Sequence, residues 1–316
     1  MAVTRGRDRS RRRFQPIGLS VGAMAAAILL TAGAGASAGA AAPARWIVFS
    51  ATPLAVSQVQ AEQLFRIRTS GDGLKQLTTG ALPSVAPAFS PDGKRIAFAR
   101  LGVGILTMNL DGTGLRRLTT NGRDSYPTWS PDGRSIAFVR PVGTEWRLLV
   151  MSSSGATPRL LAKAPPSGRP SWRKVGLLSP SGGDLLKIDV TTGHVLKYYG
   201  ANIDATWGLN TVAVSPDLSK LTYIGARSPD PGDKECGEGP CQRFGLYLES
   251  LKSKSKRPRL LVKDVGPATF SPDGGHIVYV ADGRLTLRSL TGGASTSIAT
   301  GSDTPTDTAP PAWQPR

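Results

Sequence analysis

Histidine and cysteine are both scarce in this chain. Its 316 residues include only 2 His and 2 Cys. His194 and His276 stand in different parts of the sequence, each in a region that reads as a turn, so a Ser-His-Asp hydrolase has no evident set of parts. Two thiols cannot complete a zinc site without further ligands. We therefore expect no catalytic constellation, no metal and no cofactor.

Long uncharged stretches are also lacking, except for one near the start, from Ile17 to Ala42. An Arg-rich segment precedes it and small residues close it, which predicts an export signal over residues 1–40. Ser10–Phe14 resembles the twin-arginine signature. An ordinary secretory signal and an uncleaved N-terminal anchor are the alternatives, since the run is long enough to span a bilayer. We expect an exported protein, periplasmic, extracellular or associated with the cell envelope.

Acidic residues are few beside basic ones, 22 against 39, and the formal net charge is +17. The densest basic cluster runs from Lys252 to Arg259. We interpret it as a solvated hairpin tip, with contact to an anionic envelope polymer as the alternative. An exported chain without aromatic residues among these charges is not expected to bind nucleic acid.

A four-residue motif, Ser-Pro-Asp-Gly, occurs three times, at Ser90–Gly93, Ser130–Gly133 and Ser271–Gly274. Each copy follows an aromatic residue and precedes a short apolar run, and the first two are 40 residues apart. Pro and Asp suit the middle of a tight turn and Gly can take the left-handed conformation after it, so each copy predicts a hairpin. The residues with this structural role are Asp92, Gly93, Asp132, Gly133, Asp273 and Gly274.

The repeated unit predicts four short strands, and six such units can be traced. First strands are expected near Phe89, Trp129, Trp172, Val214, Phe270 and Trp313. The first strand near Trp313 has no second, third or fourth strand after it, and the segment from Trp46 has no first strand before it. We therefore expect the C-terminal segment to complete the first blade. The prediction is an all-β, six-bladed propeller of four-stranded antiparallel blades over residues 41–316. The in-phase Trp residues are expected in the core between blades.

The unit of an aromatic residue, Ser-Pro-Asp-Gly and Ile-Ala-Phe resembles the TolB-type propeller repeat. That repeat occurs in periplasmic TolB and in the propellers of prolyl-oligopeptidase-like peptidases. The resemblance covers nearly all of the chain after residue 45. It implies a propeller alone, because nothing here corresponds to the N-terminal domain of TolB or to the hydrolase domain of the peptidases.

Both cysteines, Cys236 and Cys241, fall in a Pro- and Gly-rich insertion at about residues 226–242. In an oxidising compartment such a pair is typical of a small disulfide loop. We expect this disulfide to shape the insertion more than to stabilise the fold, since a short loop removes little chain entropy.

The loops that lead into the first strands are the expected binding surface, because in propellers they lie at the mouth of the central tunnel. Their polar residues suit a protein or peptide ligand, although loops are polar in any case. We predict a monomeric, non-enzymatic binding or scaffold propeller in the cell envelope. The alternative is an enzyme of the lactonase or cyclase kind with a metal in the tunnel. The candidate binding residues are Arg123, Asp124, Tyr126, Ser167, Arg169, Asn202, Asp204, Asp303, Thr304 and Asp307.

Overall fold

A computed structural model describes most of the chain after residue 44. The described residues are 45–53, 61–162, 169–181, 184–200, 212–227, 243–252, 258–263, 265–301, 303–306 and 309–315. The export signal predicted at residues 1–40 lies outside them. All regular elements in these ranges are β strands, and none of the ranges contains a helix that could cross a membrane.

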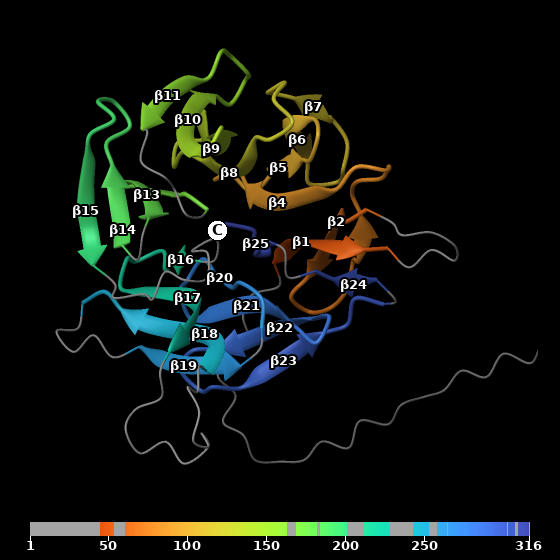
Figure 1. The fold of residues 1–316 in the computed structure, drawn as a ribbon. Helices are drawn as coiled ribbons and strands as arrows, with labels where there is room; N and C mark the ends of the chain where they lie inside the picture. Colours follow the sequence, from red (N-terminus) through yellow and green to blue (C-terminus); the bar gives the residue numbers. More distant parts are fainter. Residues whose placement is uncertain are drawn as a thin grey trace, which may run out of the picture. The chain divides into compact units, whose positions relative to one another are not determined.

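The strands form six antiparallel sheets, which are the blades of a ring (Figure 1). From the innermost strand outward, blade 1 consists of β24 (Thr304–Pro305) with β25 (Ala312–Trp313), then β1 (Trp46–Thr52), β2 (Gln63–Arg68) and β3 (Lys75–Gln76), and blade 2 consists of β4 (Ser84–Phe89), β5 (Arg95–Arg100), β6 (Gly104–Asn109) and β7 (Arg116–Arg117). In the same order, blade 3 consists of β8 (Ser125–Trp129), β9 (Ser135–Val142), β10 (Glu145–Ser152) and β11 (Arg159–Ala162), and blade 4 consists of β12 (Ser171–Arg173), β13 (Gly176–Ser181), β14 (Asp184–Ile188) and β15 (Val195–Gly200). Blade 5 consists of β16 (Ala213–Val214), β17 (Lys220–Arg227), β18 (Arg243–Ser250) and β19 (Arg259–Lys263), and blade 6 consists of β20 (Thr269–Phe270), β21 (His276–Ala281), β22 (Arg284–Ser289) and β23 (Ser295–Ile298).

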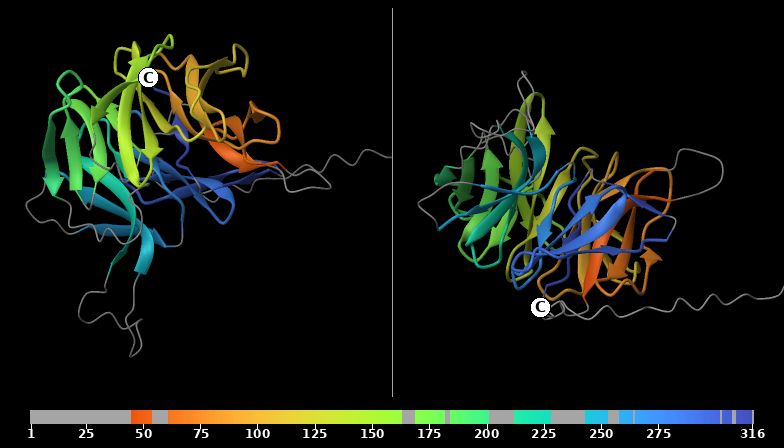
Figure 2. Two further views of the ribbon diagram at one scale, coloured as in Figure 1. Left: turned by 45° about the horizontal axis from the view of Figure 1, so that its top comes forward. Right: turned by 90° about the horizontal axis from the view of Figure 1, so that it is seen from below.

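The hydrophobic core is divided into six clusters, and each cluster joins two neighbouring blades. Phe98 of blade 2, for example, packs with Val48 of blade 1, and Phe138 of blade 3 packs with Ile105 of blade 2. The other clusters join blades 3 and 4, 4 and 5, 5 and 6, and 6 and 1. Burial of apolar side chains between sheets therefore holds the ring together. The turned views of Figure 2 show the sheets side by side around the ring.

The C-terminal segment completes blade 1, which confirms the predicted closure. Trp313 in β25 pairs with Ile47 in β1, and Ala312 pairs with Val48. One detail differs from the prediction, because the innermost strand of this blade is split. β24 also pairs with β1, through Pro305 and Ala51. The sheet thus has five strands, while six blades of antiparallel strands are confirmed.

The Ser-Pro-Asp-Gly turns have the same hydrogen bonds in each copy. In the first, the Gly93 N–H donates to the Ser90 carbonyl at 2.9 Å and the Arg95 N–H donates to the Ser90 hydroxyl at 2.9 Å. The Asp92 carboxylate accepts from the Lys94 N–H. Gly93 has a φ of 69°, in the left-handed region that favours glycine. These bonds satisfy the backbone groups of the turn locally, so the motif is a structural one.

Two blades depart from the motif at this turn. In blade 5, Leu218 takes the place of the glycine and still has a positive φ of 58°. In blade 4, Arg173 pairs directly with Gly176, and Lys174 and Val175 form a tighter two-residue turn. Blade 4 therefore carries Arg173 and Lys174 at the two positions where blades 2, 3, 5 and 6 have Ser and Pro.

Candidate functional site

A cavity of about 830 Å³ lies where the six innermost strands meet. Every blade contributes to its wall, and blade 4 contributes the longest continuous stretch, residues 169–175. Much of the wall is aromatic or proline. The lining residues of this kind are Phe89, Pro91, Trp129, Pro131, Pro170, Trp172, Pro216, Phe270, Pro272, Pro310, Trp313 and Pro315. Rigid rings of this kind offer apolar contact area at a low cost in conformational entropy.

The three in-phase tryptophans belong both to the core and to the cavity wall. Trp129 and Trp313 are buried within inter-blade clusters, and Trp172 packs against another cluster. All three also line the cavity. Their N–H groups differ, since that of Trp129 donates to the Ala88 carbonyl at 3.2 Å, whereas that of Trp313 is buried without a hydrogen-bond partner.

The charged residues in the described part of the cavity wall are all cationic, and all come from blade 4: Arg169, Arg173 and Lys174. Nη2 of Arg169 donates to the Pro87 carbonyl in blade 2 at 2.7 Å. This side chain therefore extends from blade 4 beyond the neighbouring blade 3. An Nη2 of Arg173 donates to the Val214 carbonyl in blade 5 at 2.8 Å. Burial lowers the pKa of Arg169 to about 10, with a further lowering by the charge of Arg173. Burial also lowers the pKa of Arg173.

Two bulges in the inner strands shape this region. The ladder between β4 and β5 shifts register between Val85 and Ala88, where Ala86 has a φ of 54°. The ladder between β8 and β9 shifts in the same way next to Tyr126, whose φ is 52°. A bulge leaves a residue outside the ladder and re-aims its neighbours. In β4 the bulge places the Pro87 carbonyl where Arg169 can bind it.

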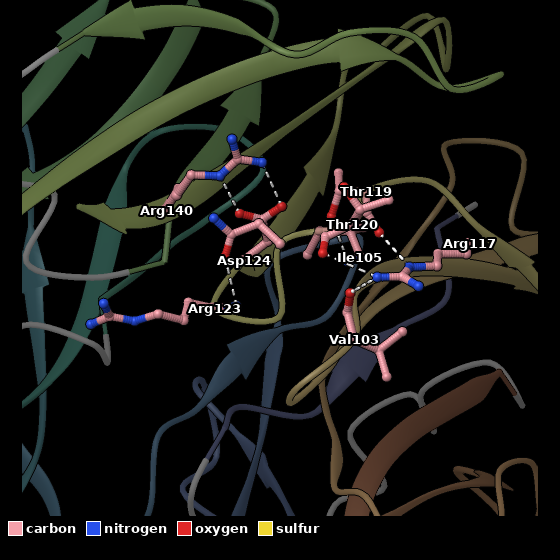
Figure 3. Close-up of polar contacts among 9 residues, drawn as sticks. Val103, Ile105, Arg117, Thr119, Thr120, Arg123, Asp124 and Arg140 are labelled. Carbon is pink, nitrogen blue, oxygen red and sulfur yellow. Dashed lines mark hydrogen bonds and ion pairs between the residues drawn. The ribbon is translucent and has the colours of Figure 1, made fainter.

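Among the predicted loop residues, Asp124 has a well-defined structural contact. Its side chain is fully buried, and its two oxygens accept from Nε and Nη2 of Arg140 at 2.6 and 2.8 Å. Figure 3 shows this bidentate pair, with Arg123 extended away from it. Asp124 thereby fixes the start of β8 to β9, and the pairing raises the pKa of Arg140, chiefly through the hydrogen bond to Asp124.

The remaining predicted residues lie in several settings. Arg123 is exposed, and its backbone N–H donates to the Asn121 side chain. Tyr126 packs against the core between blades 3 and 4, and burial raises its pKa against the opposing charge of Arg169. The Asp303 carbonyl accepts from the Thr300 hydroxyl, and Thr304 is exposed in β24. Of the predicted binding residues within the described ranges, Arg169 is the one that lines the cavity.

Several predictions concern residues outside the described ranges. These are the binding residues Ser167, Asn202, Asp204 and Asp307, and the disulfide partners Cys236 and Cys241. Within the described ranges, no three His, Cys, Asp or Glu side chains come together as a metal-binding group. His276 lies on β21 and its Nδ1 is buried without a partner.

Arg173 and Lys174 were missed as candidate binding residues. The signal was present in the sequence, because Arg173–Gly176 replaces the turn motif of the other units. Because these residues do not form the Ser-Pro-Asp-Gly turn, they are not needed for the structural role that this turn has in the other units. Which way Arg173 faces could not be read from the sequence, since that depends on the tighter turn and on the neighbouring Val214 carbonyl.

Comparisons with known proteins bear on the fold. No family model and no curated protein matches the chain. The structure is similar to that of TolB from Acinetobacter baumannii, with a TM-score of 0.62 and 18% identity over 86% of this chain and 67% of that one. It is also similar to a TolB-assigned protein from Agrobacterium tumefaciens, with a TM-score of 0.52 and 17% identity over 85% of this chain and 93% of that one. The comparison with an oligogalacturonate lyase in complex with manganese has a TM-score of 0.47 and 14% sequence identity, over 76% of this chain and 71% of that one. The described residues therefore have the fold of a TolB-like, six-bladed β-propeller.

Proposed function

We propose that this protein is an exported, non-enzymatic binding propeller that recognises a protein or peptide partner in the cell envelope at its central cavity. The observation that carries the proposal is the cavity of about 830 Å³, with its aromatic, proline and arginine wall. Tryptophan and arginine are the residue types that contribute most to binding energy in protein interfaces. The N-terminal segment, residues 1–40, would direct export, and the protein would act as a monomer.

The charge of the cavity wall favours this function over the alternative of a metal-dependent enzyme. Arg169, Arg173 and Lys174 create a positive potential around the cavity. Such a potential attracts anionic groups of a partner and opposes the binding of a metal cation. The likeness to TolB structures supports the fold of such a binding protein, and the partner itself belongs to the proposal.

Site-specific photocrosslinking in the native cell tests the proposal. A photoreactive amino acid replaces Val175, which lines the cavity and is 36% exposed. The matched control replaces Leu115, which is 51% exposed and lies outside the lining residues, in the hairpin before β7. We expect one envelope protein or peptide to be attached through position 175 and not through position 115.

A third position separates the cavity from the predicted loop surface. Arg123 is exposed in the loop before β8. The same partner attached from positions 123 and 175 would extend the site to this loop. If position 175 attaches nothing beyond what position 115 attaches, the cavity is not the binding site and the proposal fails.

A further inference from the structure

The two arginines of the cavity wall carry like charges and are each only partly exposed. A buried charge is costly unless an opposite charge or several hydrogen bonds compensate it. Arg169 and Arg173 face the same cavity, and no Asp or Glu is among the described residues of its wall. The contacts that the structure gives them are to neutral carbonyl groups, those of Pro87 and Val214.

Most of the hydrogen-bonding capacity of these arginines is left for a ligand. A guanidinium has five N–H donors in one plane. Nη2 is the donor in both carbonyl contacts, and Nε of Arg173 is buried without a partner. From blade 1, Trp313 lines the same cavity, and its indole N–H is buried without a hydrogen-bond partner.

The ionisation of Arg169 points the same way. Its pKa is lowered to about 10 by burial and then by the charge of Arg173. Both causes disfavour the charged form, and an anion close to the two guanidinium groups would offset both. The contrast with Arg140 is direct, because its partner Asp124 raises its pKa.

We propose that Arg169 and Arg173 form a binding site for a carboxylate group within the propeller tunnel, supplied by an acidic side chain or the C-terminus of the partner. This inference rests on the proposed function, since it names the chemistry that the partner presents. The planar fork of a guanidinium matches a carboxylate in a bidentate geometry. The tryptophan and proline side chains around the two arginines would pack against the apolar part of the partner residue that supplies the carboxylate.

A matched pair of small probes tests the site on the full chain. Acetate carries the carboxylate, and acetamide has nearly the same shape without the charge. Because Trp129, Trp172 and Trp313 line the cavity, binding is read from tryptophan fluorescence at constant ionic strength. We expect acetate to bind at least about tenfold more tightly than acetamide, since a charge-assisted hydrogen bond is stronger than a neutral one.

Variants locate the effect. Arg173→Gln is expected to abolish the preference for acetate, and Arg173→Lys to retain part of it. Arg117→Gln is the matched control, because Arg117 also donates to backbone carbonyls, those of Val103 and Thr119, and lies outside the lining residues (Figure 3). Arg169→Gln is compared only if its melting curve matches that of the wild type, since Arg169 also ties blade 4 to blade 2.

The outcomes separate this inference from the proposed function. Equal affinity for acetate and acetamide, or an acetate preference that survives in Arg173→Gln, overturns the carboxylate site. Inorganic phosphate binding about tenfold or more above acetate also overturns it, because the ligand group would then be a phosphate. If photocrosslinking at Val175 nevertheless attaches a partner, the binding function stands without the carboxylate. If that crosslinking fails while acetate binds as expected, the anion site stands and the envelope partner falls.

Discussion

At Gly133, the fourth residue of the second turn motif, glycine is required by the backbone and not by space. Gly133 has a φ of 72°, and a Cβ built there would meet only Pro91 atoms at 3.6 Å and beyond, an ordinary contact. The backbone conformation alone therefore opposes a larger residue. Leu218, at the equivalent place in blade 5, holds a φ of 58° and lies among the apolar residues packed beside Val214.

Replacing Gly133 isolates this effect. We expect Gly133→Ala to lower the free energy of unfolding by about 1 kcal/mol, because an L-residue is strained in the left-handed region. Urea denaturation measures the change. Gly292→Ala is the control, since Gly292 has no positive φ and nothing within 4 Å of a Cβ, and it should stay within about 0.5 kcal/mol of the wild type. A cost that is the same at both positions would contradict the explanation.

At the scale of elements, the ion pair between Asp124 and Arg140 joins the start of β8 to β9. Asp124 is fully buried, while the Arg140 side chain is 22% exposed. The pair lies beside the bulge at Tyr126, where the ladder of backbone hydrogen bonds is interrupted. It therefore supplies a fixed contact where the backbone pairing between the two strands is weakest.

Removing the charge of Asp124 tests this structural role. We expect Asp124→Asn to destabilise the protein by about 2 kcal/mol, because it leaves a partly buried guanidinium without its counter-charge. The neighbouring exposed residue gives the control, and Arg123→Ala should change the free energy of unfolding by less than about 0.5 kcal/mol. Both are measured by urea denaturation. An unchanged midpoint for Asp124→Asn would contradict this structural role.

The elements of the blades could be predicted from the sequence, and their special contacts could not. The turn motif and the apolar runs after it are local signals, so five first strands and the closing segment near Trp313 were located correctly. The role of Asp124 depends on Arg140, in the next strand, and no local pattern reveals that pairing. The bulges at Ala86 and Tyr126 were missed for the same reason, as was β24, which has no motif of its own.

At the scale of the whole molecule, the ring depends on the strand that comes last in the chain. β24 and β25 cover the inner edge of β1, and Trp313 joins the core shared by blades 6 and 1. Without them β1 would have an unpaired edge, which can pair with a strand of another chain.

Deleting residues 303–316 tests this dependence. We expect the shortened chain to lose more than about 3 kcal/mol of stability, since the loss of a buried Trp alone costs that much. It should also self-associate through β1, as measured by light scattering after size-exclusion chromatography. Trp313→Ala is the matched variant, because it loses the side chain and keeps the backbone pairing. It should be destabilised but remain a monomer, and association of both variants to the same extent would contradict the role of the β1 edge.

The closing of blade 1 also sets an order of events during folding. The Gln314 N–H donates to the Trp46 carbonyl, and these two residues are 268 positions apart in the chain. Contacts between distant positions form late, because a long loop must be closed before they can stabilise anything. The other five blades are built from neighbouring segments and can form as the chain is synthesised. The central cavity and its wall, with Trp313 as part of it, are therefore the last features of the protein to be completed.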